Sequence, residues 1–318
     1  MHFEKIEQAY QLLLENTQLI ESKLDISIYE ALIEQNAYYL GEASDEATIM
    51  ANNGCLRELG LTAEEWRRSF QFLFLKASQE QPLQANHQFT PDSIGFIILY
   101  LLEELTPQLS SFDLLEIGSG TGNLAETLVI NSRKKIDYLG IEADDLLIDL
   151  SASIADVIGS DIRFVQEDAV RPQILKESDV IVSDLPIGYY PHDHLAKRYQ
   201  VGAKMGHTYA HHLLMEQALK YLKQDGIAIF LAPSNLLTSE QSALLKDWLR
   251  HHASLLAVVA LPEAFFGSQQ YVKSLFVLQK QRQQPVETFV YPLSDLQNPD
   301  AITAFMKNFQ NWKQESAI

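Results

Sequence analysis

The sequence contains a single cysteine, Cys55, among 318 residues. This scarcity excludes an internal disulfide framework and a cysteine-rich zinc site. No apolar run approaches the ~20 residues that a membrane-spanning helix needs. The first residues, MHFEKIEQAYQLLLEN, form an acidic amphipathic pattern and lack the basic start and apolar centre of a signal peptide. We therefore expect a soluble, cytoplasmic protein without membrane contacts.

Basic residues are also scarce. The chain has 24 lysines and arginines against 42 aspartates and glutamates, for a net charge of −18 at pH 7. Neutralising nucleic-acid phosphates requires clustered basic side chains, so this balance argues against a protein that binds nucleic acid unaided. Apolar residues make up 47% of the chain, which suffices for a packed core and excludes wholesale disorder.

Residues 1–85 are predicted to form an N-terminal helical domain. Apolar side chains recur at helical spacing from Ile6 to Leu14. Thr62 followed by Glu65 has the pattern of a capping box at the start of a further helix. This segment is acidic, with 6 basic and 14 acidic residues.

Residues 86–318 are predicted to form a second domain of the α/β class. Seven short apolar runs alternate with helical stretches: FDLLEIG, DYLGIEA, IRFVQED, DVIVSDLP, GIAIFLAP, LLAVVALP and KSLFVLQK. Several runs are continuously apolar, as strands buried on both faces are. The alternation predicts a doubly wound, mostly parallel sheet of seven strands with helices on both faces. A helix over residues 300–312 is expected to close the chain.

A glycine-rich turn follows the first of these runs, in LLEIGSGTGNLAETL. Glycines permit positive φ angles and a close approach of backbone to a ligand, and the helix that follows offers unpaired N–H groups. A dinucleotide-binding turn requires G-x-G-x-x-G, but Asn123 occupies the third glycine position. The spacing is instead E-x-G-x-G-x-G, formed by Glu116, Gly118, Gly120 and Gly122.

This spacing resembles motif I of the class I S-adenosylmethionine-dependent methyltransferases, which have a Rossmann-like fold. In that family the turn holds the methionine end of the cofactor. Glu142 ends the second run, where a carboxylate can accept both ribose hydroxyls, a position that also fits NAD. The resemblance implies that Asp168, after the third run, meets the adenine amino group of S-adenosylmethionine. HQFTPDSIGF resembles motif X of the adenine-N6 methylases, which implies that Thr90 contacts the amino-acid end.

The fourth run ends in DVIVSDLPIGYYP, and ligands of open α/β sheets bind beyond the carboxyl ends of the strands. The Asp184 side chain and the Leu185 carbonyl can each accept a hydrogen bond from an amino group and aim its lone pair at a methyl sulfonium. The segment resembles motif IV of the amino-methyltransferases, [DNS]-P-P-[YFW]. Asp184 and Pro186 match its first and third positions, whereas Leu185 and Ile187 depart from it.

Ile187 stands where that motif has its stacking aromatic residue. Tyr189 and Tyr190, two and three positions later, are the candidates to contact a target base. The later segment ALPEAFFGSQQYVKSLFVLQK resembles the hairpin region of type I modification subunits. That resemblance implies that Phe266, or alternatively Phe265, lies near the target base.

The motif order over residues 87–280 resembles the YtxK-type methyltransferases of Gram-positive bacteria. These are short relatives of the type I modification subunit and are named as adenine-specific DNA methylases. The resemblance implies S-adenosylmethionine-dependent methylation of adenine N6 in DNA. Two alternatives remain open: the same edge could hold a protein glutamine or an RNA base, or the chain could bind the cofactor without catalysis as a partner protein.

Only about 38 residues follow the last expected strand, too few for a target-recognition domain. With a net charge of −18, binding of DNA would need a basic protein partner or a locally basic groove. Lys197, Arg198 and Lys204 follow the DLPIGYY segment and are candidates, together with the basic run at 133–135. No metal is expected, because His207 and His211 lack an intervening glutamate and a third ligand.

Overall fold

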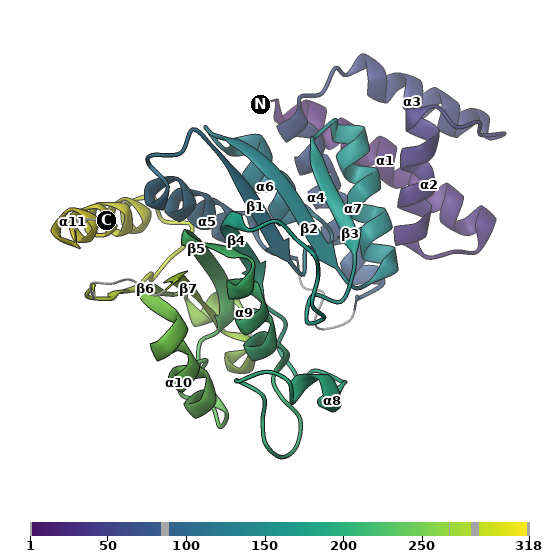
Figure 1. Ribbon diagram of the computed structural model, residues 1–318. Coiled ribbons are helices and arrows are strands. Elements are labelled where there is room, and N and C mark those ends of the chain that lie inside the picture. Colours follow the sequence, from purple (N-terminus) through teal and green to yellow (C-terminus); the bar gives the residue numbers. More distant parts are fainter. Residues whose placement is uncertain (1, 84–88, 267, 281–285, 317–318) are drawn as a thin grey trace. The chain divides into compact units, whose positions relative to one another are not determined.

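The computed structural model describes residues 2–83, 89–266, 268–280 and 286–316 of the chain (Figure 1). The chain divides into two compact units. Unit 1 consists of Met1–Thr90, Ser119–Arg133 and Tyr138–Gln166, and unit 2 consists of Pro91–Gly118, Lys134–Asp137 and Glu167–Ile318. The alternating α/β part of the sequence therefore contributes to both units.

Unit 1 contains a pair of parallel strands and six of the described helices. The helices are α1 (Phe3–Leu24), α2 (Ile28–Leu40), α3 (Ala47–Glu58), α4 (Ala63–Glu80), α6 (Asn123–Asn131) and α7 (Asp145–Ile158). The strands are β2 (Lys135–Glu142), whose first three residues belong to unit 2, and β3 (Ile162–Gln166). Glu142 lies opposite Gln166 where both strands end.

The sequence correctly predicted the start of α4. Thr62 Oγ1 accepts a hydrogen bond from the Glu65 backbone N–H at 3.3 Å, and the Glu65 carboxylate accepts one from the Thr62 N–H at 3.0 Å. Ser27 and Glu30 form a second capping box at the start of α2. Each box satisfies backbone donors that the first turn of a helix leaves without intrahelical partners.

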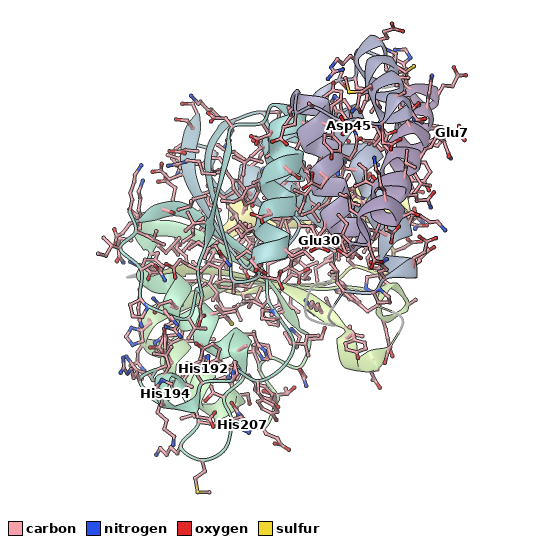
Figure 2. The ribbon with its side chains drawn as sticks, turned by 90° about the vertical axis from the view of Figure 1, so that its right-hand side faces the viewer. Glu7, Glu30, Asp45, His192, His194 and His207 are labelled. Atoms are coloured by element: carbon pink, nitrogen blue, oxygen red, sulfur yellow. The ribbon has the colours of Figure 1, made fainter. Side chains whose placement is uncertain are left out.

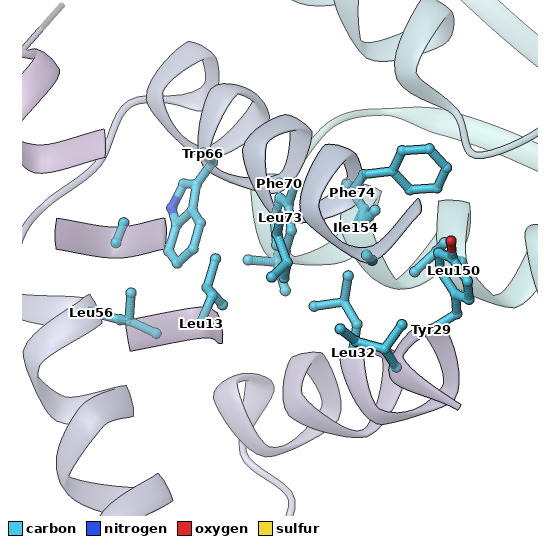
Figure 3. Close-up of a cluster of buried hydrophobic side chains, with 14 residues drawn as sticks. Leu13, Tyr29, Leu32, Leu56, Trp66, Phe70, Leu73, Phe74, Leu150 and Ile154 are labelled. Carbon is cyan, nitrogen blue, oxygen red and sulfur yellow. The ribbon is translucent and has the colours of Figure 1, made fainter. Parts of the chain in front are cut away.

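The core of unit 1 joins the N-terminal helices to α7. Figure 3 shows Leu13 of α1, Leu32 of α2 and Phe70 of α4 in one apolar cluster with Leu150 and Ile154 of α7. Burial of a side chain of this size contributes about 1.5–3 kcal/mol. The acidic N-terminal helices are therefore integral to the packing of α7, which follows strand β2.

A buried arginine links α4 to α6. Arg67, 2% exposed, donates two hydrogen bonds to the Glu64 carboxylate, at 2.7 and 2.8 Å, and one to Thr127 Oγ1 at 3.1 Å. Burial alone would raise the pKa of Glu64, but hydrogen bonds from Arg67 and Arg68 outweigh burial and lower this pKa to about 2. The ion pair therefore persists at neutral pH beside the helix that follows the glycine turn.

Unit 2 contains a six-stranded sheet. Its strands are β1 (Ser111–Ile117), β4 (Ser178–Asp184), β5 (Leu222–Pro233), β6 (Ala253–Ala260), β7 (Lys273–Lys280) and β8 (Phe289–Pro292). Its α-helices are α5 (Asp92–Leu105), α8 (Asp193–Ala196), α9 (Ala210–Lys220), α10 (Ser242–His252) and α11 (Pro299–Ser316), with 3₁₀ turns at Glu263–Phe265 and Gln269–Tyr271. Figure 1 shows α5 and α11 on one face of this sheet and α9 and α10 on the other.

The strands of unit 2 lie in the order β1-β4-β5-β7-β6-β8. β4 pairs in parallel with β1 and β5, whereas β7 pairs antiparallel with β5 and β6. Asp184 lies opposite Leu231 of β5, and Lys273 lies opposite Pro233 at the end of the same strand. The order and register thus bring the end of β4 and the beginning of β7 to the same edge.

The described residues contain eight strands, so the prediction of seven was wrong by one. The seven predicted runs correspond to β1–β7, and the additional strand is β8, which pairs in parallel with β6. β8 has only four residues, too few to show an apolar periodicity. Its Phe289 packs against Phe305, Phe309 and Trp312 of α11, so distant residues stabilise it.

The closing helix α11 confirms the helix expected near the C-terminal end. Among the helices that the structure describes, none combines the length and apolarity needed to cross a bilayer.

Candidate active site

The glycine turn has the backbone conformation that its sequence predicts. Gly118, Gly120 and Gly122 have φ angles of 71°, 53° and 77°. A Cβ atom on Gly118 or Gly120 would meet no atom within 4 Å, whereas one on Gly122 would lie 3.0 Å from Ser151 and 3.1 Å from Phe164. The first two glycines therefore leave the backbone open to a ligand, and the third permits close packing against α7 and β3.

Glu142 ties the end of β2 to this turn within unit 1. Its Oε2 accepts a hydrogen bond from the Gly120 N–H at 2.8 Å, and its Oε1 accepts from the N–H groups of Ala143 and Asp144 at 2.8 and 3.1 Å. A carboxylate offers about four acceptor positions, so a ribose hydroxyl can still donate to it. The acid predicted to bind ribose thus also holds the turn in shape.

Thr90 lies beside the start of α6. The Asn123 side-chain amide donates to the Thr90 carbonyl at 2.8 Å, and the neighbouring Phe89 ring stacks on Phe74 of α4 with centroids 5.2 Å apart. Unit 1 therefore brings the motif X threonine, the last two glycines of the turn and Glu142 together, although they span more than 50 positions of the chain.

A buried acid lies beyond the turn, on α6. Glu126 is 1% exposed and accepts a hydrogen bond from Ser160 Oγ at 2.6 Å, while its Oε2 has no hydrogen-bond partner within the described part of the chain. Burial raises the pKa of Glu126 to about 7. The side chain lines a small pocket with Arg67, Phe70 and Gly122.

In unit 2, Glu116 is buried in β1 and Asp168 is partly exposed. Asp168 Oδ1 accepts from the Val170 N–H at 3.0 Å, and its Oδ2 accepts from the Tyr190 hydroxyl at 2.5 Å. Burial and this hydrogen bond raise the pKa of Tyr190, so that its hydroxyl remains a donor. The structure therefore places Tyr190, 6% exposed, under Asp168, where it orients the carboxylate predicted to meet adenine.

The segment after Asp184 continues the edge of β4. The Leu185 N–H donates to the Leu231 carbonyl at 2.9 Å, and the Leu185 side chain is fully buried. The next carbonyl, that of Pro186, accepts a hydrogen bond from the ring of His211 on α9. Burial lowers the pKa of His211 to about 4, so the ring is neutral at pH 7 and donates its N–H to that carbonyl.

Tyr189 is the exposed end of a stack of three rings. Its ring is 55% exposed and lies parallel to Tyr209, with centroids 4.8 Å apart and planes at 6°; Tyr209 in turn stacks on His211 at 5.0 Å. The Ala210 N–H donates to the Gly188 carbonyl at 3.0 Å and holds the two segments together. An aromatic side chain is therefore presented near the position where Ile187 departs from motif IV.

Lys273 is a site residue that the sequence analysis did not single out. Its ammonium donates to Asp184 Oδ1 and, at 2.9 Å, to the Leu185 carbonyl, and the residue is 6% exposed. Lys273 is the first residue of strand β7 and precedes the apolar run Leu275–Leu278. A lysine beside an apolar run was the signal in the sequence that could have identified this residue. Its hydrogen-bond partners could not be predicted, because they depend on the order of the strands in the sheet.

Phe265 is the last residue of the 3₁₀ turn Glu263–Phe265, which follows β6, and Phe266 comes directly after it. Both are partly buried and contact each other edge to face at 5.8 Å. No contact between Phe266 and Tyr189 is present among the ring contacts of the described residues.

The segment 192–207, which follows the DLPIGYY segment, is basic, and its charged side chains lie at the surface. Lys197, Arg198 and Lys204 are exposed, and Figure 2 shows His192, His194 and His207 near one another in the same region. Asp193 is the sole acidic residue in this segment and lies 3.0 Å from His207 Nδ1. The local charge is therefore positive in a strongly acidic chain.

Known proteins share both the sequence and the fold. The uncharacterized protein YtxK of Bacillus subtilis is 31% identical over 325 residues, covering 98% of each chain. A Listeria monocytogenes protein proposed to be a class I S-adenosylmethionine-dependent methyltransferase is 29% identical, with a TM-score of 0.90 over 98% of this chain and 99% of that one. A methyltransferase subunit of a type I restriction-modification system from Streptococcus thermophilus, at 16% identity and a TM-score of 0.69 over 84% and 61%, shares the fold.

A family model described as N-6 DNA Methylase matches residues 68–312, which is most of the chain. Together with the identity to the Bacillus relative over nearly the whole length, this match shows the family. The chain belongs to the N-6 DNA methylase family of S-adenosylmethionine-dependent methyltransferases.

Proposed function

We propose that this protein methylates an amino nitrogen, and that its acceptor is N6 of adenine in DNA. One observation carries the proposal: the Asp184 carboxylate and the Leu185 carbonyl converge on a single nitrogen, that of Lys273. Two acceptors on one nitrogen are what an exocyclic amino group requires, because it has two N–H donors.

The residues of the glycine turn fit S-adenosylmethionine. The open positions at Gly118 and Gly120 allow the backbone to approach the methionine end, and Glu142 retains acceptor capacity for the ribose. Asp168 would accept from the adenine amino group, held in orientation by Tyr190. The bound cofactor supplies an electrophilic methyl carbon on its sulfonium.

The acceptor amine would donate one N–H to Asp184 Oδ1 and the other to the Leu185 carbonyl. These bonds orient the nitrogen lone pair, and orientation of this kind lowers the barrier of a bimolecular step by several kcal/mol. The nitrogen would take the methyl group from the cofactor's sulfur, which keeps the electron pair of the broken bond, and would lose one proton to Asp184 Oδ1 or to water.

Two features favour a nucleic-acid base over a protein glutamine. Tyr189 offers an exposed aromatic face on which an extruded base can stack. The basic segment 192–207 can contact phosphates. The net charge of −18 leads us to propose that a protein partner completes the DNA-binding surface.

The test is transfer of a labelled methyl group from S-adenosylmethionine to DNA, RNA and protein fractions. We expect label in DNA, and a loss on the order of a hundredfold or more with Asp184→Ala, because the acceptor nitrogen is then misplaced. Asp225→Ala is a matched control, since Asp225 is exposed on β5, near the opposite end of the strand from Leu231.

Label in protein or RNA alone would contradict the choice of acceptor. Cofactor binding without label in any fraction, with and without cell extract as a source of partner, would contradict transfer and favour the non-catalytic alternative.

A further inference from the structure

Lys273 lies where the acceptor nitrogen would lie. It opens β7, opposite Pro233 at the end of β5, and its side chain crosses β5 to reach the end of β4. There the ammonium donates to both the Asp184 carboxylate and the Leu185 carbonyl. These are the same two acceptors that an amino substrate would use under the proposed function.

An amine that donated to both oxygens would lie about 2.9 Å from each of them, in the region where the Lys273 ammonium lies. Competition between the two nitrogens for this region is therefore what the proposal requires. The ion pair also stabilises the protein before an acceptor binds, because the Asp184 side chain is only 12% exposed and the Lys273 side chain only 7%. A buried carboxylate without a cationic or hydrogen-bonding partner is strongly destabilising.

We propose that Lys273 closes the acceptor site in the free protein and withdraws when the acceptor amine enters, so that it acts as an internal competitor of the substrate. This inference rests on the proposed function, because that function identifies the amine as adenine N6. The hydrogen bonds of Lys273 to Asp184 and Leu185 lie wholly within unit 2 and do not depend on the proposed function. An acceptor must therefore break two charge-assisted hydrogen bonds before it gains its own.

The experiment compares Lys273→Met with the wild type in the full-length protein. The probes are a short single-stranded oligonucleotide with one adenine and the same oligonucleotide with purine, which lacks the amino group, in its place. Affinities are measured by fluorescence anisotropy, and the adenine-to-purine affinity ratio is the readout. Lys280→Met is the matched control: Lys280 ends the same strand, pairs with Glu177 at 3.6 Å, and its replacement changes the net charge equally.

We expect the ratio to rise about tenfold to a hundredfold in Lys273→Met, since each bond to a charged group contributes about that factor, and to stay unchanged in Lys280→Met. Equal ratios in Lys273→Met and wild type, including equal absence of binding, overturn the proposal. A lower kcat without a change in ratio also overturns it and makes Lys273 a positioning residue for Asp184. A raised ratio without methylation of either probe supports the competitor and refutes the proposed function.

A second measurement needs no substitution and remains valid if Lys273→Met fails to fold. Acetylation of lysines by acetic anhydride is followed residue by residue with mass spectrometry in the wild type. The adenine oligonucleotide, but not the purine one, is expected to raise the acetylation rate of Lys273 severalfold while that of Lys280 stays constant. An acetylation rate at Lys273 that does not change when the adenine oligonucleotide is added would overturn the proposal that Lys273 withdraws.

Discussion

The buried acid Glu126 allows a quantitative test of the packing around the glycine turn. Its pKa is 4.5 in the unfolded chain and about 7 in the folded protein, mainly because the side chain is buried. Between these values the folded protein holds a proton that the unfolded chain has released. The free energy of unfolding therefore falls by about 1.4 kcal/mol for each pH unit in this range. At pH 8 the total loss relative to low pH is about 3 kcal/mol.

Replacement of Glu126 by Gln removes the charge at every pH and keeps an oxygen that can accept from Ser160. The variant is expected to match the wild type near pH 4.5 and to exceed it by about 3 kcal/mol at pH 8. The assay is urea unfolding at both pH values. Glu7→Gln, on the exposed face of α1, is the control and should show a small difference at both. A Glu126→Gln advantage that does not change with pH would refute the reasoning.

Three further outcomes follow from other contacts of the structure. Arg67→Met is expected to lower the free energy of unfolding at pH 7 by about 1.5–3 kcal/mol, because Glu64 loses the buried one of its two arginine partners. Urea titrations measure this loss, and a loss below about 0.5 kcal/mol, a third of the lower bound, would contradict the reasoning. Gly120→Ala, at a φ of 53°, is expected to lower the free energy of unfolding by about 1–2 kcal/mol. Its affinity for the cofactor, measured by calorimetry, is expected to fall more than tenfold, and an unchanged affinity would contradict a role for the turn. Tyr209→Leu removes the ring beneath Tyr189 and is expected to raise the acceptor KM about two- to tenfold with kcat retained; an unchanged KM would contradict the stacking role.

Local spacing was sufficient for the elements and for the glycine turn. The capping box at Thr62 and Glu65, the runs that form β1–β7 and the positive φ angles after Glu116 all depend on neighbours within a few positions. Steric and hydrogen-bonding preferences at that range are written in the sequence itself. The strand β8 was missed because four residues carry no periodicity and because α11 stabilises it.

The different environments of Tyr189 and Tyr190 could not be predicted from local spacing. They are adjacent and chemically identical, yet Tyr190 is buried under Asp168 while Tyr189 stacks on Tyr209 and remains exposed. Successive side chains of an extended segment point to opposite sides. Pairing with the segment before α9, which fixes the register, decides which tyrosine faces the protein interior.

The sequence by itself was sufficient to predict the α/β class and to single out Asp184 and Leu185 as candidate hydrogen-bond acceptors. Only the tertiary structure decided that Lys273 occupies those acceptors, because 88 and 89 positions separate the partners along the chain. Their meeting requires β7 to run antiparallel beside β5. Strand order and direction result from burying whole apolar faces against one another, and no local spacing encodes them.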